Sequence, residues 1–241
     1  MTQLPNIEVL YEDNHLIAIN KRSGDLVQGD KTGDKPLLDI VKDYIKIKEN
    51  KPGEVFLGSP HRIDRPTSGI VVFTKTSKAL TRMNKMFHDK EIQKTYWAIV
   101  KNKPAKPHDT IVHFLKKNKQ KNKSMAYSHE YKDAKRSELE FKIIHQFDNF
   151  YLLNIKPFTG RHHQIRVQLS TIGCPIKGDL KYGFNRSNPD ASISLHARKI
   201  EFIHPVKKEP LVIIAKPNPA DSLWKVAGER FITWVRYKIY W

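Results

Sequence analysis

A series of short apolar segments separated by polar turns limits the possible folds of this chain more than any other feature. Segments of this kind, rich in Val, Ile, Leu, Phe and Tyr, are typical of β-strands. They cover residues 9–11, 16–19, 69–75, 95–100, 110–115, 125–131, 137–145, 150–156, 193–204 and 211–215. So many strands with few helices between them predict an α+β fold around a mixed or largely antiparallel sheet, and not a doubly wound parallel sheet.

Other segments have the apolar spacing of helices. Residues 36–47 place apolar side chains on one helical face and begin with a proline, which suits a first turn. Ser77 is expected to cap a second helix. Residues 160–172 also follow a helical period, and Gly173 is a natural C-terminal stop.

We expect residues 1–241 to form a single domain, because the chain shows no internal repeat and no long linker rich in Pro, Gly or Ser. Hydrophobic residues make up 39% of the chain, which is enough for a sizeable core. The last twenty residues are too aromatic for a loose tail and are expected to pack on that core. Among their aromatic side chains are those of Trp224, Phe231, Trp234, Tyr240 and Trp241.

The charge of the chain is strongly positive. Lys and Arg number 43 against 25 Asp and Glu, a formal net charge of +18. Such an excess on a folded domain indicates a polyanionic partner, with nucleic acid the first candidate. Five lysines fall in the eight residues 116–123, which we place in a hairpin loop. A solvated loop without a partner would have the same composition. A membrane surface is disfavoured, because the run has no apolar face.

Other classes of protein are excluded by what the sequence lacks. The single cysteine, Cys174, cannot form an internal disulfide, and the N-terminus resembles no secretion signal. No apolar stretch is long enough for a membrane span, so we expect a cytoplasmic protein. There is no phosphate-binding glycine motif, C-x-x-C or H-E-x-x-H. A metal site is not expected either, since the adjacent His162 and His163 would point about 100° apart on a helix.

Two segments combine charged residues in a way that points to chemistry. Residues 61–69 precede a predicted buried strand and place Asp64 between Arg62 and Arg65. Positive charge on both sides favours the ionised carboxylate, which can act as a nucleophile or as a base. A turn in which Asp64 merely pairs with an arginine is the structural alternative.

The second segment, residues 160–166, opens the predicted helix at 160–172. Its first amides suit a phosphate group, and Arg166 can reach inward to a carboxylate. A basic, solvated first turn is the alternative. In a third segment, residues 94–98, Tyr96 and Trp97 face opposite sides of a predicted strand. One of these rings is expected in the core, and the other is free to stack on a base.

Together these segments resemble the RluA family of RNA pseudouridine synthases. That family carries H-R-L-D-R-x-T-S-G, K-x-Y, G-R-x-H-Q-I-R and G-D-x-x-Y-G in this order. The matching segments here are residues 61–69, 94–96, 160–166 and 178–183, with further matches at 195–197 and 204–205. The similarity extends from about Ile7 to Pro217.

The resemblance implies an enzyme that breaks the N-glycosidic bond of a uridine, rotates the uracil and rejoins it through C5, without cofactor or metal. Asp64 matches the essential carboxylate, which attacks C1′ or removes a proton from C2′; the sequence leaves both routes open. Arg166 matches the arginine that pairs with it. Tyr96 matches the tyrosine that packs on the target base, where its hydroxyl can transfer a proton.

The same resemblance implies a structured RNA substrate, ribosomal or transfer RNA, with the target base flipped out of a stem-loop. The RNA-binding residues it indicates are Arg62, Arg65, Arg161, His163 and Lys94. Arg62 matches the arginine that fills the space left by the flipped base. The protein is expected to be a monomer.

The chain departs from the family pattern in a few places. His162 stands where Thr or Ser is usual, Gln168 replaces a histidine, and Arg22 replaces the proline of N-K-P-x-G. Many relatives carry an added N-terminal RNA-binding domain, whereas here the catalytic pattern begins almost at Met1, so we expect selectivity to come from the catalytic domain and its insertions. Two alternatives remain: an RNA-binding protein of the same fold without catalysis, and a glycosylase that releases the base.

Overall fold

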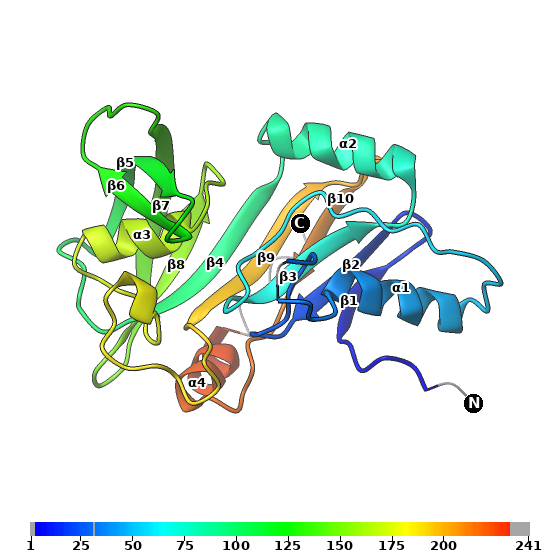
Figure 1. Ribbon diagram of the computed structural model, residues 1–241. Coiled ribbons are helices and arrows are strands. Elements are labelled where there is room, and N and C mark those ends of the chain that lie inside the picture. The colour runs from blue at the N-terminus through cyan, green and yellow to red at the C-terminus, as the bar shows by residue number, and fades with distance from the viewer. Residues whose placement is uncertain (1–2, 31, 232–241) are drawn as a thin grey trace.

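One long sheet organises the molecule, and the computed structural model describes residues 3–30 and 32–231. Its strands are β1 (Val9–Glu12), β2 (Leu16–Lys21), β3 (Ser68–Thr74), β4 (Gln93–Val100), β5 (His108–Asn118), β6 (Lys123–Tyr127), β7 (Lys135–Gln146), β8 (Tyr151–Pro157), β9 (Leu195–Ile203) and β10 (Pro210–Ile214). Their order is β1-β2-β3-β9-β4-β8-β7-β5-β6, with β10 added to β9 (Figure 1). Only the β3–β9 pair is parallel among the described strands, which confirms the predicted fold class.

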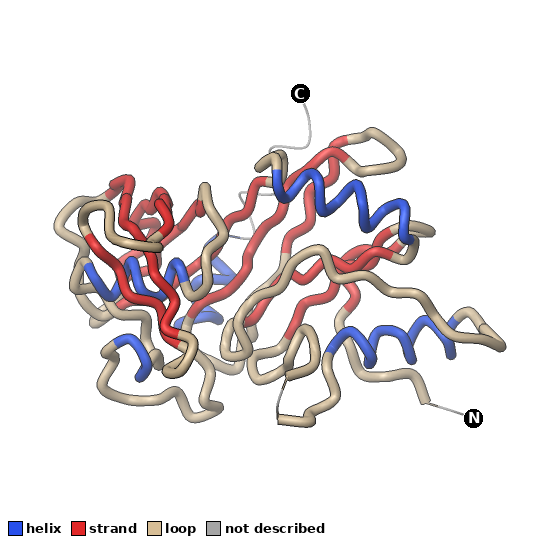
Figure 2. The backbone as a smooth tube through the Cα atoms, turned by 45° about the horizontal axis from the view of Figure 1, so that its top comes forward, coloured by secondary structure: helices blue, strands red, loops and turns tan. Residues whose placement is uncertain are grey.

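Helices α1 (Leu37–Lys48) and α2 (Ser77–His88) cover opposite faces of strands β2 and β3. Successive strand residues point to opposite faces, so Ile17 and Ile19 pack with α1 while Leu16 and Ala18 pack with α2. The two helices therefore pack on opposite faces of the same layer of strands (Figure 2). The cap of α2 was predicted one residue too late, since the Thr76 hydroxyl accepts the Ala79 N–H at 3.2 Å.

Helix α3 (Gln164–Thr171) begins later than the predicted start at Gly160. His163 has φ 53°, a left-handed conformation that cannot continue a helix backwards. The Gln164 side chain fixes the preceding loop in a non-helical conformation. Its Oε1 accepts the Arg161 N–H at 3.0 Å, and its Nε2 donates to the Glu138 carbonyl at 3.0 Å. Arg166 consequently lies in the first turn of α3, and the predicted stop at Gly173 is confirmed.

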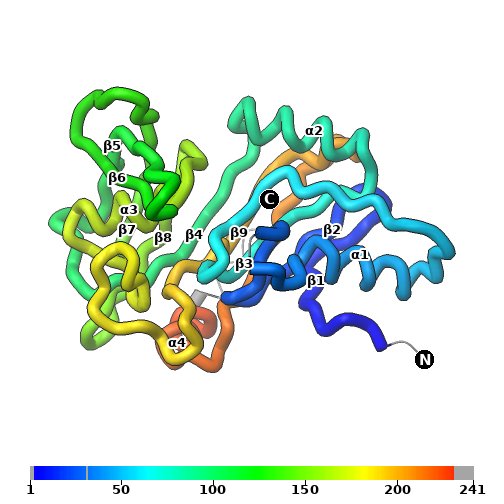
Figure 3. Tube along the Cα trace, in the orientation of Figure 1, coloured from blue at the N-terminus to red at the C-terminus, as the bar shows by residue number. Residues whose placement is uncertain are grey.

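The lysine-rich run occupies the hairpin between β5 and β6, as predicted. Residues 116–118 end β5, 119–122 form the turn, and Lys123 begins β6. Strand β6 ends at Tyr127, so the predicted strand at 125–131 was too long at its C-terminal end. The hairpin forms one edge of the sheet, far along the strand order from α1, which packs on β2 and β3 (Figure 3).

Helix α4 (Ser222–Phe231) brings the C-terminal part of the chain back to the sheet. Trp224 is buried there with Trp97, Ile99 and Leu152, so the predicted packing is confirmed for this residue. Trp234, Tyr240 and Trp241 lie outside the described residues. Within the described part of the chain, no helix has the length and apolar character needed to cross a bilayer.

Candidate active site

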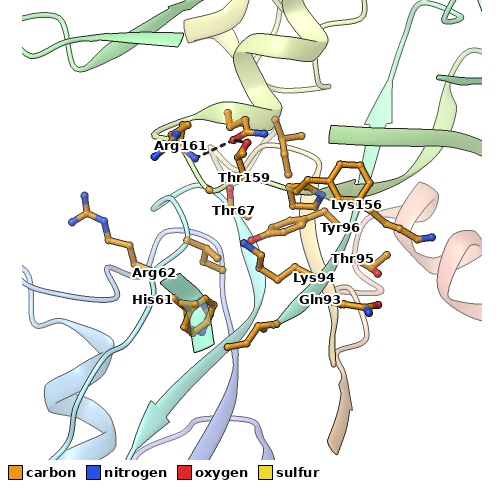
Figure 4. A pocket seen from close by; sticks show the side chains of 18 of the residues that line it. His61, Arg62, Thr67, Gln93, Lys94, Thr95, Tyr96, Lys156, Thr159 and Arg161 are labelled. Carbon is orange, nitrogen blue, oxygen red and sulfur yellow. Dashed lines mark hydrogen bonds between the residues drawn. The ribbon is translucent and has the colours of Figure 1, made fainter. Parts of the chain in front are cut away.

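A cavity of about 1000 Å³ opens between the loop before β3, strand β4 and the start of α3. Three of the segments singled out in the sequence, residues 61–69, 94–96 and 160–166, contribute to its lining, although about a hundred residues separate the first from the last. Figure 4 shows Arg62, Lys94, Tyr96 and Arg161 around it. Among the residues that line it are His61, Arg62, Asp64, Lys94, Tyr96, Lys156, Arg161, His163 and Arg166.

Lys21, the last residue of β2, fixes the loop that carries Asp64. The ammonium group of Lys21 is buried and donates to three carbonyls, those of Arg22 at 2.8 Å, Asp25 at 2.9 Å and Arg65 at 3.0 Å. Burial lowers the pKa of Lys21 to about 8. The loop then turns, with the Thr67 N–H donating to the Asp64 carbonyl at 3.0 Å. Asp64 is thus presented by a backbone that is fixed on both sides.

The following strand brings this loop against β9. Gly69 has φ 109°, and a Cβ there would lie 2.4 Å from the Ala197 carbonyl oxygen. Only glycine therefore allows β3 to approach β9 this closely. Ala197 on β9 is also the register partner of Tyr96 on β4. The close approach of β3 to β9 therefore brings the loop that carries Asp64 near Tyr96.

Arg166 joins two carboxylates at the floor of the cavity. Its Nη1 donates to Asp64 Oδ2 at 3.0 Å, so the predicted contact between these residues is present. Its Nε and Nη2 donate to Asp179 at 2.7 Å and 2.9 Å. Burial opposes the charged guanidinium, yet the hydrogen bonds and charges of Asp179 and then Asp64 raise the pKa of Arg166. The Asp64 side chain remains 28% exposed and accessible from the cavity.

His163 lies beside this pair and is largely buried. Its Nε2 is 3.8 Å from Asp64 Oδ2, and its Nδ1 is 2.9 Å from the Tyr182 hydroxyl. That hydroxyl oxygen accepts the Ser124 N–H at 2.8 Å, which leaves its own proton for Nδ1 of a neutral imidazole. Burial, with the charge of Arg166, lowers the pKa of His163 to about 2. The neutral ring then carries its proton on Nε2, toward Asp64.

The neighbouring His162 does not point away from His163. The ring centroids are 3.7 Å apart and the rings are stacked, so the predicted divergence was wrong. The prediction assumed helical geometry at both residues, whereas His163 is left-handed. His162 Nδ1 faces the Ser124 hydroxyl at 2.9 Å, and burial lowers its pKa to about 4.

Tyr96 and Trp97 face opposite sides of β4, as predicted. Trp97 is the core residue, only 4% exposed, and the Arg198 guanidinium carbon lies 4.3 Å from its ring centroid. Tyr96 lines the cavity. Burial and the charge of Asp64 raise the pKa of the Tyr96 hydroxyl, which therefore stays protonated at neutral pH. The structure thus places a neutral phenol near the carboxylate.

The predicted RNA-binding residues separate into two groups. Arg62, Lys94 and Arg161 line the cavity, and burial lowers the pKa of Lys94. Arg65 turns away: it donates to the Gly24 carbonyl at 2.9 Å and to Asp34 at 2.6 Å, and it does not line the cavity. Arg65 therefore lies on the other side of the loop, beside an acidic partner and a carbonyl, and its expected contact with RNA stays a prediction.

His163 is the other residue in a different setting from the one expected, since its side chain is only 7% exposed and its ring nitrogens face Tyr182 and Asp64. Its position suits a role in arranging Asp64 better than contact with RNA.

Several residues that shape the site were not identified from the sequence. Asp179 and Tyr182 belong to the matched segment at 178–183, so a signal was present without a role. Lys21 is the lysine of the segment compared with N-K-P-x-G, where it was given no role, and Ser124 gave no local signal. His61 was noticed only as part of its motif: its Nε2 accepts the Val72 N–H at 2.9 Å, its ring stacks on Phe87, and burial lowers its pKa to about 3.

Within residues 3–30 and 32–231, no group of three His, Cys, Asp or Glu side chains is placed to hold a metal ion. The groups that line the described cavity include a carboxylate, a phenol and several cations, which are suited to acid–base chemistry.

Comparison with known proteins identifies the family. Residues 15–171 match the model of the RNA pseudouridylate synthase family, a span that contains Asp64, Tyr96 and Arg166. The chain belongs to this family. The resemblance inferred from the motifs is confirmed.

Curated relatives support the assignment. A protein named ribosomal large subunit pseudouridine synthase C from Buchnera aphidicola subsp. Schizaphis graminum is 36% identical over 90% of this chain and 68% of its own length. The protein of the same name from Vibrio vulnificus is 34% identical over 86% of this chain and 64% of its own length. A tRNA pseudouridine synthase C from Pectobacterium carotovorum is 30% identical over 96% of this chain and 64% of its own length. The chain thus spans about two thirds of these relatives.

Solved structures show the same fold. The human RNA pseudouridylate synthase domain containing 4 has a TM-score of 0.75 at 22% identity, covering 92% of this chain and 93% of its own. The human RNA pseudouridylate synthase domain containing 1 has a TM-score of 0.71 at 19% identity, covering 99% and 98%. The architecture is therefore kept at low sequence identity.

Proposed function

We propose that the protein is an RNA pseudouridine synthase that isomerises uridine in a structured RNA, with Asp64 as the essential carboxylate. The observation that carries the proposal is the Asp64–Arg166 contact of 3.0 Å at the floor of a cavity lined by cations. An ionised carboxylate held by one hydrogen bond on one oxygen keeps the other oxygen available for reaction. The bidentate grip of Asp179 on Arg166 supports this role, because it fixes the guanidinium that holds Asp64.

The reaction breaks the C1′–N1 bond, rotates the uracil, forms a C1′–C5 bond and removes the proton from C5. Asp64 either attacks C1′ or takes the C2′ proton, and both routes start from the ionised carboxylate. Tyr96 packs on the base, and its hydroxyl relays the C5 proton. Since the raised pKa keeps this hydroxyl protonated, it accepts a proton only by passing its own to a second acceptor. The C5 proton passes to solvent, and N1, once free of C1′, takes up a proton in its place, so the product has the same composition and mass as the substrate.

RNA binding follows from the position of the cations. Arg62, Lys94 and Arg161 line the cavity and would face phosphate groups of a strand whose target base is flipped into it. Arg62 is exposed at the rim, where it can fill the space that the base leaves. The names of the relatives, which refer to the ribosomal large subunit and to tRNA, make stem-loops in these RNAs the first substrates to test.

Three further features belong to the proposal. Residues 1–241 act as one catalytic domain, which the single continuous sheet supports. The protein is a monomer that works in the cytoplasm, a location supported by relatives that are named for the ribosomal large subunit and for tRNA.

The deciding experiment follows tritium release from RNA labelled at uridine C5. Ribosomal and transfer RNA from cells lacking the protein are incubated with wild type or with Asp64→Asn. Release by wild type and none by Asp64→Asn establishes both the reaction and the residue. Salt-sensitive binding without release would instead support an RNA-binding protein. Loss of base mass from the RNA would identify a glycosylase, because isomerisation leaves the mass unchanged.

A further inference from the structure

The lysine-rich hairpin carries cations that have no acidic partners. The side chains of Lys117, Lys119 and Lys121 are exposed and form no ion pair with any described residue. Lys116 differs, since its ammonium group lies 3.4 Å from Asp133 and donates to the Lys132 carbonyl at 3.1 Å. Like charges spaced this closely repel one another, so the lysines of the hairpin repel each other in the free protein without a compensating negative charge.

The hairpin is nevertheless fixed, because it is docked on the segment that opens α3. The Ser124 hydroxyl donates to the His162 carbonyl at 2.7 Å. Asn122 Oδ1 lies 3.1 Å from His162 Nε2, and the Asn122 carbonyl accepts the Lys181 ammonium group at 3.2 Å. These contacts hold the turn against residues next to the active site and not out in solvent.

The docking also connects the hairpin directly to Asp64. The Ser124 N–H donates to the Tyr182 hydroxyl at 2.8 Å, Tyr182 contacts His163 Nδ1 at 2.9 Å, and His163 Nε2 faces Asp64 at 3.8 Å. Two side chains therefore separate the hairpin backbone from the carboxylate. The charge of Lys117 contributes to lowering the pKa of both His162 and His163, which agrees with its closeness to the site.

We propose that the hairpin of residues 116–123 is a second RNA-binding element, whose Lys117, Lys119 and Lys121 grip phosphates of the strand that flanks the target uridine. A polyanion satisfies the charge of the hairpin, and docking beside Asp64 places that charge along the strand entering the cavity. The element is preorganised, so binding costs little ordering of the protein backbone. This inference rests on the proposed function for the nature of the polyanion.

Lysines can also protect an exposed sheet edge from pairing with another chain. Strand β6 is such an edge, because it is the last strand in the order. That explanation fits residues on β6 itself. Lys119 and Lys121 lie in the turn and Lys117 on β5, away from the open edge of β6. RNA binding accounts for all three residues.

The test compares two triple variants with equal loss of charge. The first is Lys117→Gln with Lys119→Gln and Lys121→Gln. The control is Lys42→Gln with Lys46→Gln and Lys51→Gln, which removes lysines around α1 that are paired with acids at 3.6, 3.7 and 2.7 Å. Binding of a uridine-containing stem-loop RNA is measured over a range of salt, together with the KM and kcat of tritium release from ribosomal and transfer RNA.

The hairpin variant is expected to reduce the slope of log Kd against log salt by about 2 to 3, since each lost phosphate contact removes roughly 0.7 to 0.9. KM should rise about tenfold or more with kcat unchanged, because only ground-state binding is removed. A slope equal to that of the control overturns the inference, as does aggregation of the hairpin variant with unchanged RNA affinity.

The two proposals fail separately. If wild type releases no tritium while the hairpin variant loses the salt slope, the proposed reaction is wrong and the RNA-binding element stands. If wild type releases tritium and both triple variants bind RNA alike, only the inference about the hairpin is wrong.

Discussion

Asp179 holds Arg166 by two parallel hydrogen bonds, at 2.7 Å from Nε and 2.9 Å from Nη2, and thereby aims Nη1 at Asp64. Both members of this pair are almost fully buried, at 1% exposure for Asp179 and 5% for Arg166. The guanidinium is planar and rigid, so two hydrogen bonds to Asp179 fix the direction in which Nη1 points. Asp179 therefore positions Asp64 without touching a substrate.

Asp179→Asn tests this positioning role. The amide offers one acceptor oxygen in place of two and turns an N–H group toward Arg166. We expect tritium release to fall about 100-fold, because a small misplacement of a reacting group has effects of this size. Loss of a buried partner should also lower the free energy of unfolding by about 3 to 5 kcal/mol. RNA affinity should be unchanged.

Asp43→Asn is the matched control, since Asp43 pairs with Lys35 on an exposed surface. It should leave both stability and tritium release at wild-type values. If Asp179→Asn loses stability and keeps the wild-type kcat, Asp64 alone suffices to orient Arg166 and the positioning role is wrong.

Tyr96→Phe separates the ring of Tyr96 from its hydroxyl. The ring that packs on the base remains, so RNA affinity should change little. Without the hydroxyl the C5 proton has no relay, and kcat should fall by about 10² to 10⁴, the range of general acid–base catalysis. Tyr96→Leu removes the stacking surface as well and should weaken binding by about 1 to 3 kcal/mol. Full activity of Tyr96→Phe would assign the C5 proton transfer to another group.

Lys21→Met tests the support beneath the catalytic loop. Methionine fills a similar volume but donates no hydrogen bond, which leaves the carbonyls of Arg22, Asp25 and Arg65 without this donor. The free energy of unfolding should fall by about 2 kcal/mol or more, since a carbonyl left unsatisfied costs about 1 to 3 kcal/mol and those of Arg22 and Asp25 lose this donor. The Arg65 carbonyl keeps the Gly24 N–H at 2.9 Å. Activity should fall further than stability explains, because Arg65 is the residue after Asp64. Crystal or NMR comparison of residues 62–66 distinguishes a moved loop from a merely weaker fold.

The strands and the family motifs were predictable from local sequence, and the exceptions have physical causes. Short apolar segments between polar turns identify β2 and β8 without reference to the rest of the chain. The start of α3 was misplaced because nothing in residues 160–163 shows that Gln164 binds Glu138 on a distant strand. The contact of Arg65 with Asp34 could not be predicted for the same reason, since Asp34 is 31 residues away in sequence.

The same distinction between local sequence signals and tertiary contacts applies to the residues of the candidate site. Asp64, Tyr96 and Arg166 were identified because each lies in a motif with an unusual combination of residues. Lys21 reaches its Arg65 acceptor across 44 residues, and Ser124 reaches Tyr182 across 58. These residues act through tertiary contacts, so their roles could not be read from spacing along the chain, although Lys21 matches the lysine of N-K-P-x-G.

Because of His61, we expect the free energy of unfolding to decrease at acid pH. The neutral ring accepts the Val72 N–H at 2.9 Å, and a protonated ring has no lone pair to do so. Burial, with the charge of Lys94, lowers the pKa of His61 to about 3, whereas the unfolded chain has a value near 6.5. The stability that neutral His61 contributes is therefore complete above about pH 6.5 and is lost as the pH falls toward 3, at no more than about 1.4 kcal/mol per pH unit.

Urea unfolding of wild type and His61→Leu between about pH 7 and pH 4.5 measures this contribution. His61→Leu should be less stable at neutral pH, because Val72 loses its acceptor, but its stability should fall less steeply with acid. The buried His163 and His196, whose pKa values burial also lowers, act equally in both proteins, so the difference in slope isolates His61. Parallel curves for the two proteins would show that His61 carries the same charge in the folded and unfolded chains.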